Sequence, residues 1–299
     1  MSEGVKPIGF GAVLSVGRDL VPSEVNPPKA KPHVSVDYRV PPALCLPSST
    51  SPSSPPGLPL GVLLSIFDDI STWPIIVADP LRRPGVSVHL SATYLDPLTP
   101  LKPDSELLIT SDVKKLGNLM AFCSLECRLK ETGELVAVGE HTKYLPMGWV
   151  YEKLVPNFLP AMTFCSSKFG PELVKNERAF DAASTIPDLV RPLEPKSQGG
   201  VTRASFAVTD ECKNPMGGFH GGCQALVAHV VAGAGVAGVG EGGKALKSVS
   251  VSYMSTGKGV CDVVSEVLPR KREDDDITTS VEIMRKDGRL ISTSMMTWK

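Results

Sequence analysis

The chain has 299 residues, of which 31 are basic and 32 acidic, so its formal net charge is -1. The charges are spread along the sequence, which gives no electrostatic footprint for nucleic acid or for an anionic membrane surface. The length is sufficient for about two domains, each with its own buried core.

The seven cysteines form no CxxC pair and are odd in number. This pattern favours buried thiols in a reducing compartment over a disulfide framework or a zinc site, so we expect a cytoplasmic or mitochondrial protein that is not secreted. The longest apolar stretches, "LPLGVLLSIF" and "ALVAHVVAGAGVAGVG", are shorter than the roughly 18 residues of a membrane span. We therefore expect no transmembrane helix, and the first residues match neither a secretory signal nor a typical transit peptide.

The first half of the chain contains one helical pattern and several strand patterns. Residues 1–31 are expected to be an irregular N-terminal extension, and residues 32–40 alternate like a strand before a Pro/Ser-rich loop. From Leu60 to about Val77, apolar residues recur at helical spacing, with Pro74 marking the end of the helix or a kink. Four strand-like runs follow at 85–95, 105–115, 118–130 and 135–145. Together these elements predict a first domain over 32–146.

The second half repeats this order. Residues 147–200 contain Pro-punctuated short helices and are expected to form a connector. A strand at 200–212, a Gly-rich turn, a helix and four strands at 245–255, 259–271, 276–286 and 290–298 then predict a second domain over 201–299. The repeated order indicates an internal duplication. The pattern predicts an α+β fold in which each antiparallel sheet wraps a long helix, and the two copies form an intramolecular pseudo-dimer.

The Gly-rich turn "NPMGGFHGGCQ" leads directly into the second helix. Glycines allow a ligand to approach bare backbone N–H groups, which at a helix N-terminus attract a developing negative charge. An ordinary loop-to-helix junction is the alternative interpretation.

Several segments together resemble a known family. These are "FDDIST", "PGVSVHLSATYLDP" and "LGNLMAFCSLECRLKETGELVAVGEHTKYL" in the first half, and "NPMGGFHGG", which fits the pattern N-x-x-G-x-x-H-G-G, in the second. The chain resembles the hotdog-fold acyl-CoA thioesterases, in particular the small thioesterase-superfamily members and the phenylacetate-pathway type. The resemblance covers most of 58–146 and, more thinly, 201–299. It implies two tandem hotdog domains, each a long helix wrapped by an antiparallel sheet.

The resemblance also implies a site between the two halves. One half supplies an Asn and the HGG loop, whose backbone N–H polarises the thioester carbonyl, and the other supplies a helix carboxylate and a Ser from the next strand. The implied catalytic residues are Asp68, Ser87, Asn214 and Gly221, and the implied substrate-binding residues are His220, Gly222, Lys143 and Tyr144. The substrate would be an acyl-CoA, with no metal and no cofactor beyond the coenzyme A that it carries.

The symmetry-related second site departs from the family pattern. Pro59-Leu60-Gly61 stands where the first half should carry HGG, and Ser53 stands at the Asn position. In the second half, His229 replaces the carboxylate and Leu246 replaces the Ser. We therefore predict one working site and one inactive site.

Each proposed site residue also has a structural interpretation. Asp68 would be a solvated helix residue, Ser87 an ordinary strand hydroxyl, and Asn214 the cap of a turn. The ring of His220 is expected to bond to a neighbouring backbone group and to fix the loop. His229 is expected to be a buried His with its hydrogen bonds satisfied, and Lys143 an ordinary surface Lys.

Two functions remain open at this point. The first is an acyl-CoA thioesterase with one composite site, for which the acyl chain is not specified. The alternative is a catalytically degraded hotdog protein that serves as a structural or interaction subunit of a larger complex, for which a mitochondrial location is open. Residues 1–57 and the connector would then be docking surfaces. A homo-oligomer is compatible with either function.

Overall fold

The structure is a computed structural model, and it describes residues 20–25, 32–46, 56–81, 83–99, 101–146, 185–214, 217–269 and 275–299. The elements of the first half, in chain order, are β1 (Leu20–Val25), β2 (His33–Arg39), η1 (Pro42–Leu44), α3 (Leu60–Ala78), β3 (Val86–Tyr94), β4 (Glu106–Leu116), β5 (Met120–Leu129) and β6 (Leu135–Tyr144). Those of the second half are α6 (Ile186–Val190), β7 (Lys196–Gln198), β8 (Val201–Ala207), η3 (Asp210–Cys212), α7 (Gly221–Gly238), β9 (Leu246–Tyr253), β10 (Val260–Val267), β11 (Ile277–Arg285) and β12 (Leu290–Trp298).

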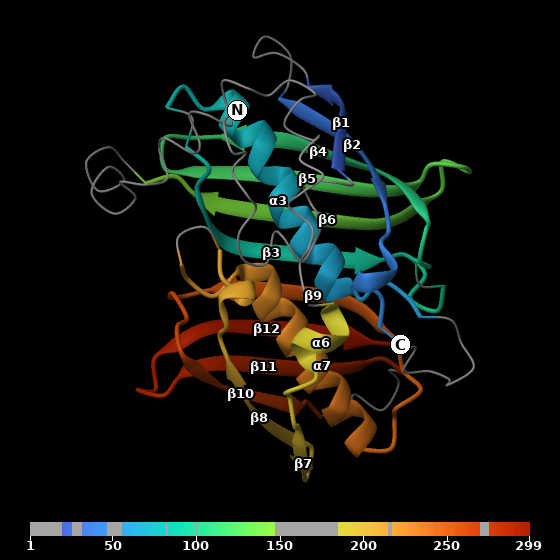
Figure 1. The fold of residues 1–299 in the computed structure, drawn as a ribbon, viewed down its shortest axis with the longest axis vertical. Helices are drawn as coiled ribbons and strands as arrows, with labels where there is room; N and C mark the ends of the chain where they lie inside the picture. Colours follow the sequence, from blue (N-terminus) through green and yellow to red (C-terminus); the bar gives the residue numbers. More distant parts are fainter. Residues whose placement is uncertain are drawn as a thin grey trace, which may run out of the picture.

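The strands form one antiparallel sheet that runs through both halves (Figure 1). Its order is β1-β2-β4-β5-β6-β3-β9-β12-β11-β10-β8-β7. The series β2-β4-β5-β6-β3 in the first half corresponds, strand by strand, to β8-β10-β11-β12-β9 in the second. The halves meet where β3 pairs with β9, from His89 opposite Ser252 to Thr93 opposite Ser248. The edge that each half would expose is thereby paired, as expected.

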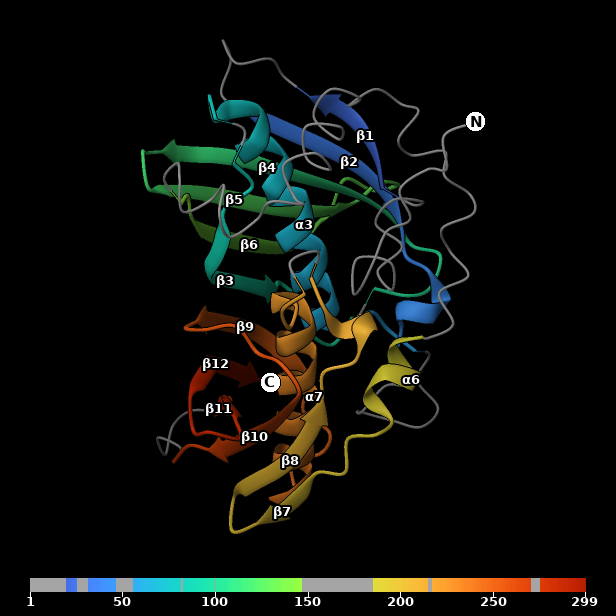
Figure 2. The ribbon, with the colours of Figure 1, turned by 60° about the vertical axis from the view of Figure 1, so that its left-hand side comes forward.

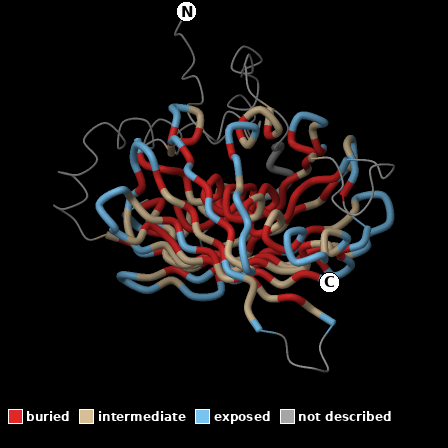
Figure 3. The backbone as a smooth tube through the Cα atoms, turned by 90° about the horizontal axis from the view of Figure 1, so that it is seen from below, coloured by how far each residue is buried: buried red, intermediate tan, exposed pale blue. Residues whose placement is uncertain are grey.

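Each half wraps its sheet around one long helix. Helix α3 packs on strands of the first half, and α7 packs on strands of the second (Figure 2). Along most strands buried and less buried residues alternate, as in β4, where Leu107, Ile109 and Ser111 face the core. Buried residues therefore gather between the helices and the sheet, and exposed residues lie mainly at the loops (Figure 3).

The two helices contact each other through their N-terminal turns. A Cβ atom on Gly222, the second residue of α7, would lie 2.1 Å from Ser65 Oγ of α3. A Cβ atom on Gly61, the second residue of α3, would lie 3.1 Å from Leu226 Cα of α7. Only a residue without a side chain fits at Gly222. The contacts are reciprocal, and they place the Gly-rich turn of the second half beside the helix of the first.

Three features differ from the sequence predictions. The segment 1–31 was expected to be irregular, but β1 lies within it and pairs with β2. Within the predicted connector, 185–200 contains the short, proline-containing helix α6, as expected, and also β7, which was not predicted and which pairs with β8; 147–184 lies outside the described residues. Of the two alternatives for Pro74, the end of the helix is wrong, because α3 continues to Ala78.

Both long helices are mostly buried inside the protein. With 19 and 18 residues, α3 and α7 are long and apolar enough to cross a membrane, but 78% of the residues in the apolar window of α3 and 61% of those in α7 are buried inside the protein. Their apolar surfaces therefore pack in the core of the fold.

Candidate active site

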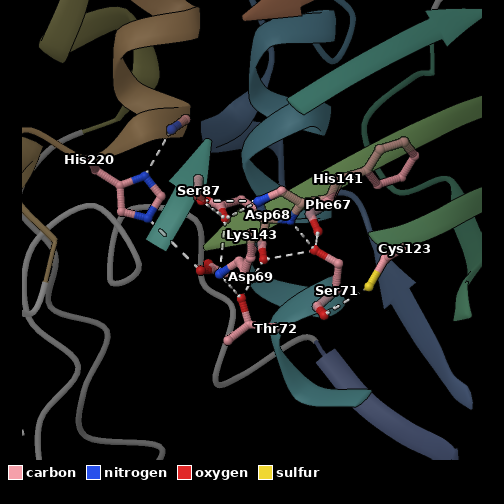
Figure 4. Close-up of polar contacts among 11 residues, drawn as sticks. Phe67, Asp68, Asp69, Ser71, Thr72, Ser87, Cys123, His141, Lys143 and His220 are labelled. Atoms are coloured by element: carbon pink, nitrogen blue, oxygen red, sulfur yellow. Dashed lines mark hydrogen bonds and ion pairs between the residues drawn. The ribbon is translucent and has the colours of Figure 1, made fainter. Parts of the chain in front are cut away.

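The predicted carboxylate, Asp68, lies at the centre of a buried polar network (Figure 4). Ser87 Oγ donates a hydrogen bond to Asp68 Oδ1 over 2.9 Å, and Lys143 Nζ lies 3.5 Å from the same oxygen. Asp68 is only 7% exposed, so it is not the solvated helix residue of the structural interpretation. Lys143 is 5% exposed and is likewise not a surface residue, and its ammonium also contacts Thr72 Oγ1 at 2.5 Å.

A β-bulge turns Ser87 toward Asp68. In β3, Leu90, Ala92 and Tyr94 face the core, so simple alternation would point Val88 inward and Ser87 outward. The pairing of β3 with β6 shifts register between Ser87 and His89, as a β-bulge does. The shift places Ser87 opposite Lys143 and brings its hydroxyl to the carboxylate of Asp68.

His141 extends this network into the core. Its Nε2 lies 3.0 Å from Ser87 Oγ, and its Nδ1 lies 2.6 Å from Ser71 Oγ. Burial lowers the pKa of His141 to about 3, so the ring is neutral at pH 7. A neutral ring with its proton on Nε2 donates to Ser87, which is then free to donate its own proton to Asp68. The chain of hydrogen bonds therefore ends on the carboxylate.

These neighbours keep Asp68 ionised. Burial alone would raise the pKa of Asp68, but the charge of Lys143 and the hydrogen bond from Ser87 outweigh burial and lower this pKa to about 2. We assign the largest share to Lys143, because the nearby ring of His141 carries no charge at neutral pH. Asp68 thus carries a fixed negative charge that is paired with one buried ammonium.

The HGG loop of the second half lies against this part of α3. His220 Nδ1 accepts a hydrogen bond from the Gly222 amide over 3.0 Å and so forms the N-cap of α7, as expected for a structural His. His220 Nε2 lies 3.9 Å from Asp69 Oδ1. Burial lowers the pKa of His220, but the carboxylates of Asp69 and Asp68 outweigh it and leave the pKa raised. The capping bond requires a lone pair on Nδ1, so the capping ring is neutral and its proton on Nε2 points to Asp69.

Gly221 is the first residue of α7, where a backbone amide has no carbonyl in a preceding turn. The ring of Tyr253 would lie 3.0 Å from a Cβ atom at Gly221, so Tyr253 forms one wall beside this amide. The buried Tyr253 hydroxyl has no hydrogen-bond partner among the described residues, and its pKa is raised by burial and, to a lesser extent, by the charge of Asp68. Tyr253 thus lies beside Gly221 of the second half and within the field of Asp68 of the first.

The other predicted residues lie at the margins of this cluster. Asn214 Oδ1 accepts a hydrogen bond from the Gly218 amide at 3.0 Å, which is the turn-closing role of the structural interpretation. Tyr144 is 41% exposed on the outer face of β6. Cys123 and Cys127 are buried on the inner face of β5, as expected for packing residues. In the described part of the chain, no three His, Cys, Asp or Glu residues are grouped to hold a metal ion.

The corresponding positions of the other half line a cavity of about 380 Å³. His229 lies where the first half has Asp68, and Leu246 where it has Ser87. Leu246 pairs with Trp298 beside a register shift that matches the bulge at Ser87, so Trp298 corresponds to Lys143. All three of these residues line the cavity.

The expectation that His229 has its hydrogen bonds satisfied is wrong. Its buried Nδ1 has no partner among the residues that the structure describes, because the ring packs edge-on against Trp298 at a centroid distance of 5.5 Å. Burial lowers the pKa of His229 to about 4, so the ring is neutral at pH 7.

Four site residues were not found from the sequence: Ser71, His141, Asp69 and Tyr253. A signal for one of them was present, because His141 and Lys143 stand two residues apart and so share one face of a strand whose other inward positions are Ala137 and Gly139. A second polar residue on an inward face indicates a buried network. Asp69 and Tyr253 gave no comparable signal.

Comparison with known proteins supports the resemblance. No family model matches the chain. The chain is 38% identical over 85 residues to acyl-coenzyme A thioesterase 13 of Mus musculus and, equally, to that of Homo sapiens. These 85 residues are 28% of this chain and 58% of each relative. The matched region thus spans little more than half the length of these relatives.

Solved structures match the whole fold. A putative thioesterase from Novosphingobium aromaticivorans is similar over 94% of this chain and 97% of its own, with a TM-score of 0.61 and 14% identity. A putative oleoyl thioesterase from Lactobacillus plantarum covers 90% and 95%, with a TM-score of 0.60 and 16% identity. A hot dog fold protein of unknown function from Alicyclobacillus acidocaldarius covers 97% and 96%, with a TM-score of 0.58 and 12% identity. The chain therefore has the hotdog fold.

Proposed function

We propose that this hotdog-fold protein is an acyl-CoA thioesterase, which hydrolyses a thioester to a carboxylate and free coenzyme A. In this proposal the chain is a tandem duplication of two hotdog domains, 32–146 and 201–299. The identical strand order of the two halves and their matching register shifts support the duplication. The partial identity to acyl-coenzyme A thioesterase 13 supports the substrate class.

One composite site would carry the reaction. Asp68 would remove a proton from a water molecule as the water oxygen attacks the thioester carbonyl, and Ser87 would help to hold that water. The negative charge that develops on the carbonyl oxygen would be stabilised by the Gly221 amide at the positive end of α7. The carbon–sulfur bond would then break, and coenzyme A would leave as the thiolate. The proposal requires no metal.

The observation that carries this proposal is the contact between the two halves at α3. The turn of α3 before Asp68 contains Ser65, against which Gly222 packs, and Asp69 faces His220. An ionised carboxylate of one half and the first amides of a helix of the other half therefore face the same region. Asn214 would act on the substrate only indirectly, by closing the turn that precedes the HGG loop.

The alternative is a non-catalytic structural or interaction subunit of a larger complex. The buried Asp68–Lys143 pair favours it, because a carboxylate with a pKa of about 2 is a weak base and an ion pair can serve packing alone. In either case we propose a reducing compartment, cytoplasmic or mitochondrial. The proposal specifies neither the acyl group of the substrate nor the oligomeric state of the protein.

The test is hydrolysis of short-chain, long-chain and aromatic acyl-CoAs by the full chain, with release of free thiol as the readout. The Asp68→Asn variant should lose about 10²- to 10⁴-fold in kcat/KM, the usual contribution of a general base. Asp104→Asn is the matched control, because Asp104 is an exposed carboxylate paired with Arg39. Absence of turnover on every substrate, or equal activity of the two variants, would refute the proposal.

A further inference from the structure

The cavity beside the N-terminus of α3 lacks the polar network of the composite site, which lies at the N-terminus of α7. The residues at the positions of Asp68, Ser87 and Lys143 are His229, Leu246 and Trp298. By the same register, Met296, which is buried in β12, stands two residues before Trp298, as His141 stands before Lys143. The four positions that hold charged or hydrogen-bonded side chains at the composite site thus hold nearly apolar side chains at this cavity.

The pocket nevertheless remains open. Its volume of about 380 Å³ lies within the range of small-molecule sites, at about 300–1,000 Å³. Apolar side chains that drift without a ligand generally close such a space, because protein interiors pack densely. Here the walls are Leu58 and Leu60, around the start of α3, and the C-terminal half of α7 from His229 to Ala237.

The polar groups in this pocket are few. The Tyr94 hydroxyl is used, because it donates to the Leu58 carbonyl over 3.0 Å. Lys244 lines the pocket, and its ammonium donates to the Asp275 carbonyl. His229 also lines the pocket, and its Nδ1 is buried without a partner among the described residues, so Nε2 is the ring nitrogen that a ligand can reach. A pocket whose side chains are apolar apart from one imidazole, one ammonium and an engaged tyrosine hydroxyl suits an aliphatic chain that ends in a carbonyl or carboxylate group.

We propose that this cavity is a second, non-catalytic binding site for an aliphatic acyl group, with His229 as the hydrogen-bond partner of its carbonyl or carboxylate oxygen. A neutral imidazole donates one such bond, and Lys244 balances the charge of a free acid. Leu60 now occupies the position of Gly221, and Pro59, which has no N–H, stands at the position of His220. The site therefore binds without activating a thioester. This inference goes beyond the proposed function and does not depend on turnover at Asp68.

The test is isothermal titration of the full chain, as the Asp68→Asn variant, with two probes. One is decanoate, and the other is the ketone analogue of decanoyl-CoA in which a methylene replaces the sulfur. Because the composite site is also expected to bind the ketone analogue, binding at the cavity is the part that is lost in the variant Leu98→Trp. Saturable binding of this kind is expected for at least one probe, and the probe that loses more of its affinity in that variant identifies the source as a free acid or a coenzyme A ester. The His229→Phe variant, which keeps the ring shape, should weaken binding about fivefold to tenfold, the usual value of one hydrogen bond.

Two exposed leucines supply variants that leave the core intact. Leu98 is 63% exposed and lines the cavity, whereas Leu95 is 53% exposed and lies outside the lining. Leu98→Trp should weaken binding of the probe at least tenfold, and Leu95→Trp should leave it unchanged. Failure of both probes to bind, or equal binding by the two Trp variants, would overturn the inference. Thiol release by the wild-type chain is measured separately, so the binding result can be interpreted even if no thioesterase activity is found.

Discussion

Replacing Lys143 with Met tests how the structure keeps Asp68 ionised. The ammonium is buried and lies 3.5 Å from Asp68 Oδ1, and its loss leaves a buried carboxylate without its cation. Breaking a buried ion pair in this way costs about 3–5 kcal/mol of unfolding free energy. The matched control is Lys286→Met, because Lys286 is 56% exposed and pairs with the exposed Asp262, so its loss should cost at most about 1 kcal/mol.

The pH dependence of stability should also change sign. In the wild type, the pKa of Asp68 falls from 3.8 to about 2, which corresponds to about 2 kcal/mol of stability that is present above pH 4 and is lost as the pH falls toward 2. Without Lys143, burial becomes the dominant influence and raises the pKa of Asp68 above 3.8. The folded variant then binds a proton more readily than the unfolded chain, so this group stabilises the variant as the pH falls.

Urea unfolding of both lysine variants and the wild type, at pH 7 and at pH 4.5, measures both effects. The account expects the deficit of Lys143→Met relative to the wild type to shrink at the lower pH. A deficit below about 1 kcal/mol at pH 7, or one that does not change with pH while Lys286→Met behaves as the wild type, would refute the assignment of Lys143 as the cation that holds Asp68 ionised.

Three further predictions concern the site and the contact between the halves. Ser87→Ala removes a hydrogen bond to the ionised Asp68, and such a bond is worth about 1.5–3 kcal/mol, so kcat/KM should fall by about tenfold or more. Ser91→Ala, on the outer side of the same strand, should leave kcat/KM unchanged. Gly222→Ala places a Cβ atom 2.1 Å from Ser65 Oγ and should lower stability by about 1–3 kcal/mol in thermal unfolding. Gly243→Ala is its control, because a Cβ atom at Gly243 would have no atom within 4 Å. Equal melting temperatures of the two variants would contradict the helix contact. His220→Ala removes the N-cap of α7 and should lower the free energy of unfolding by about 1 kcal/mol. His220→Asn should restore most of this loss, because Asn is also a good N-cap. Equal stability of the two variants would exclude capping as the role of the ring.

The arrangement of helices and strands follows from sequence patterns that the structure retains. Alternation in the strands and helical spacing after Leu60 depend on local geometry, so each predicted strand and both long helices are present. Residues 20–25 were missed, because a short edge strand needs only backbone pairing to β2 and leaves no apolar pattern.

The site was only partly predictable, because its parts depend on register. Asp68 and the HGG loop came from the family resemblance, and the structure places them on facing sides of the helix contact. The direction of Ser87 depends on a β-bulge, which strict alternation cannot show. The burial of Lys143, in contrast, follows from regular alternation along β6, where Gly139 and His141 also face inward.

The most direct test of the composite site is a crystal structure of the full chain with the ketone analogue of decanoyl-CoA. The account predicts the analogue's carbonyl oxygen about 2.7–3.1 Å from the Gly221 amide, the distance of an oxyanion donor, with the Asp68 carboxylate facing the carbonyl carbon from the first half. An analogue bound only in the cavity beside His229, with Asp68 and Gly221 making no contact to it, would contradict the central claim that the two halves share one catalytic centre.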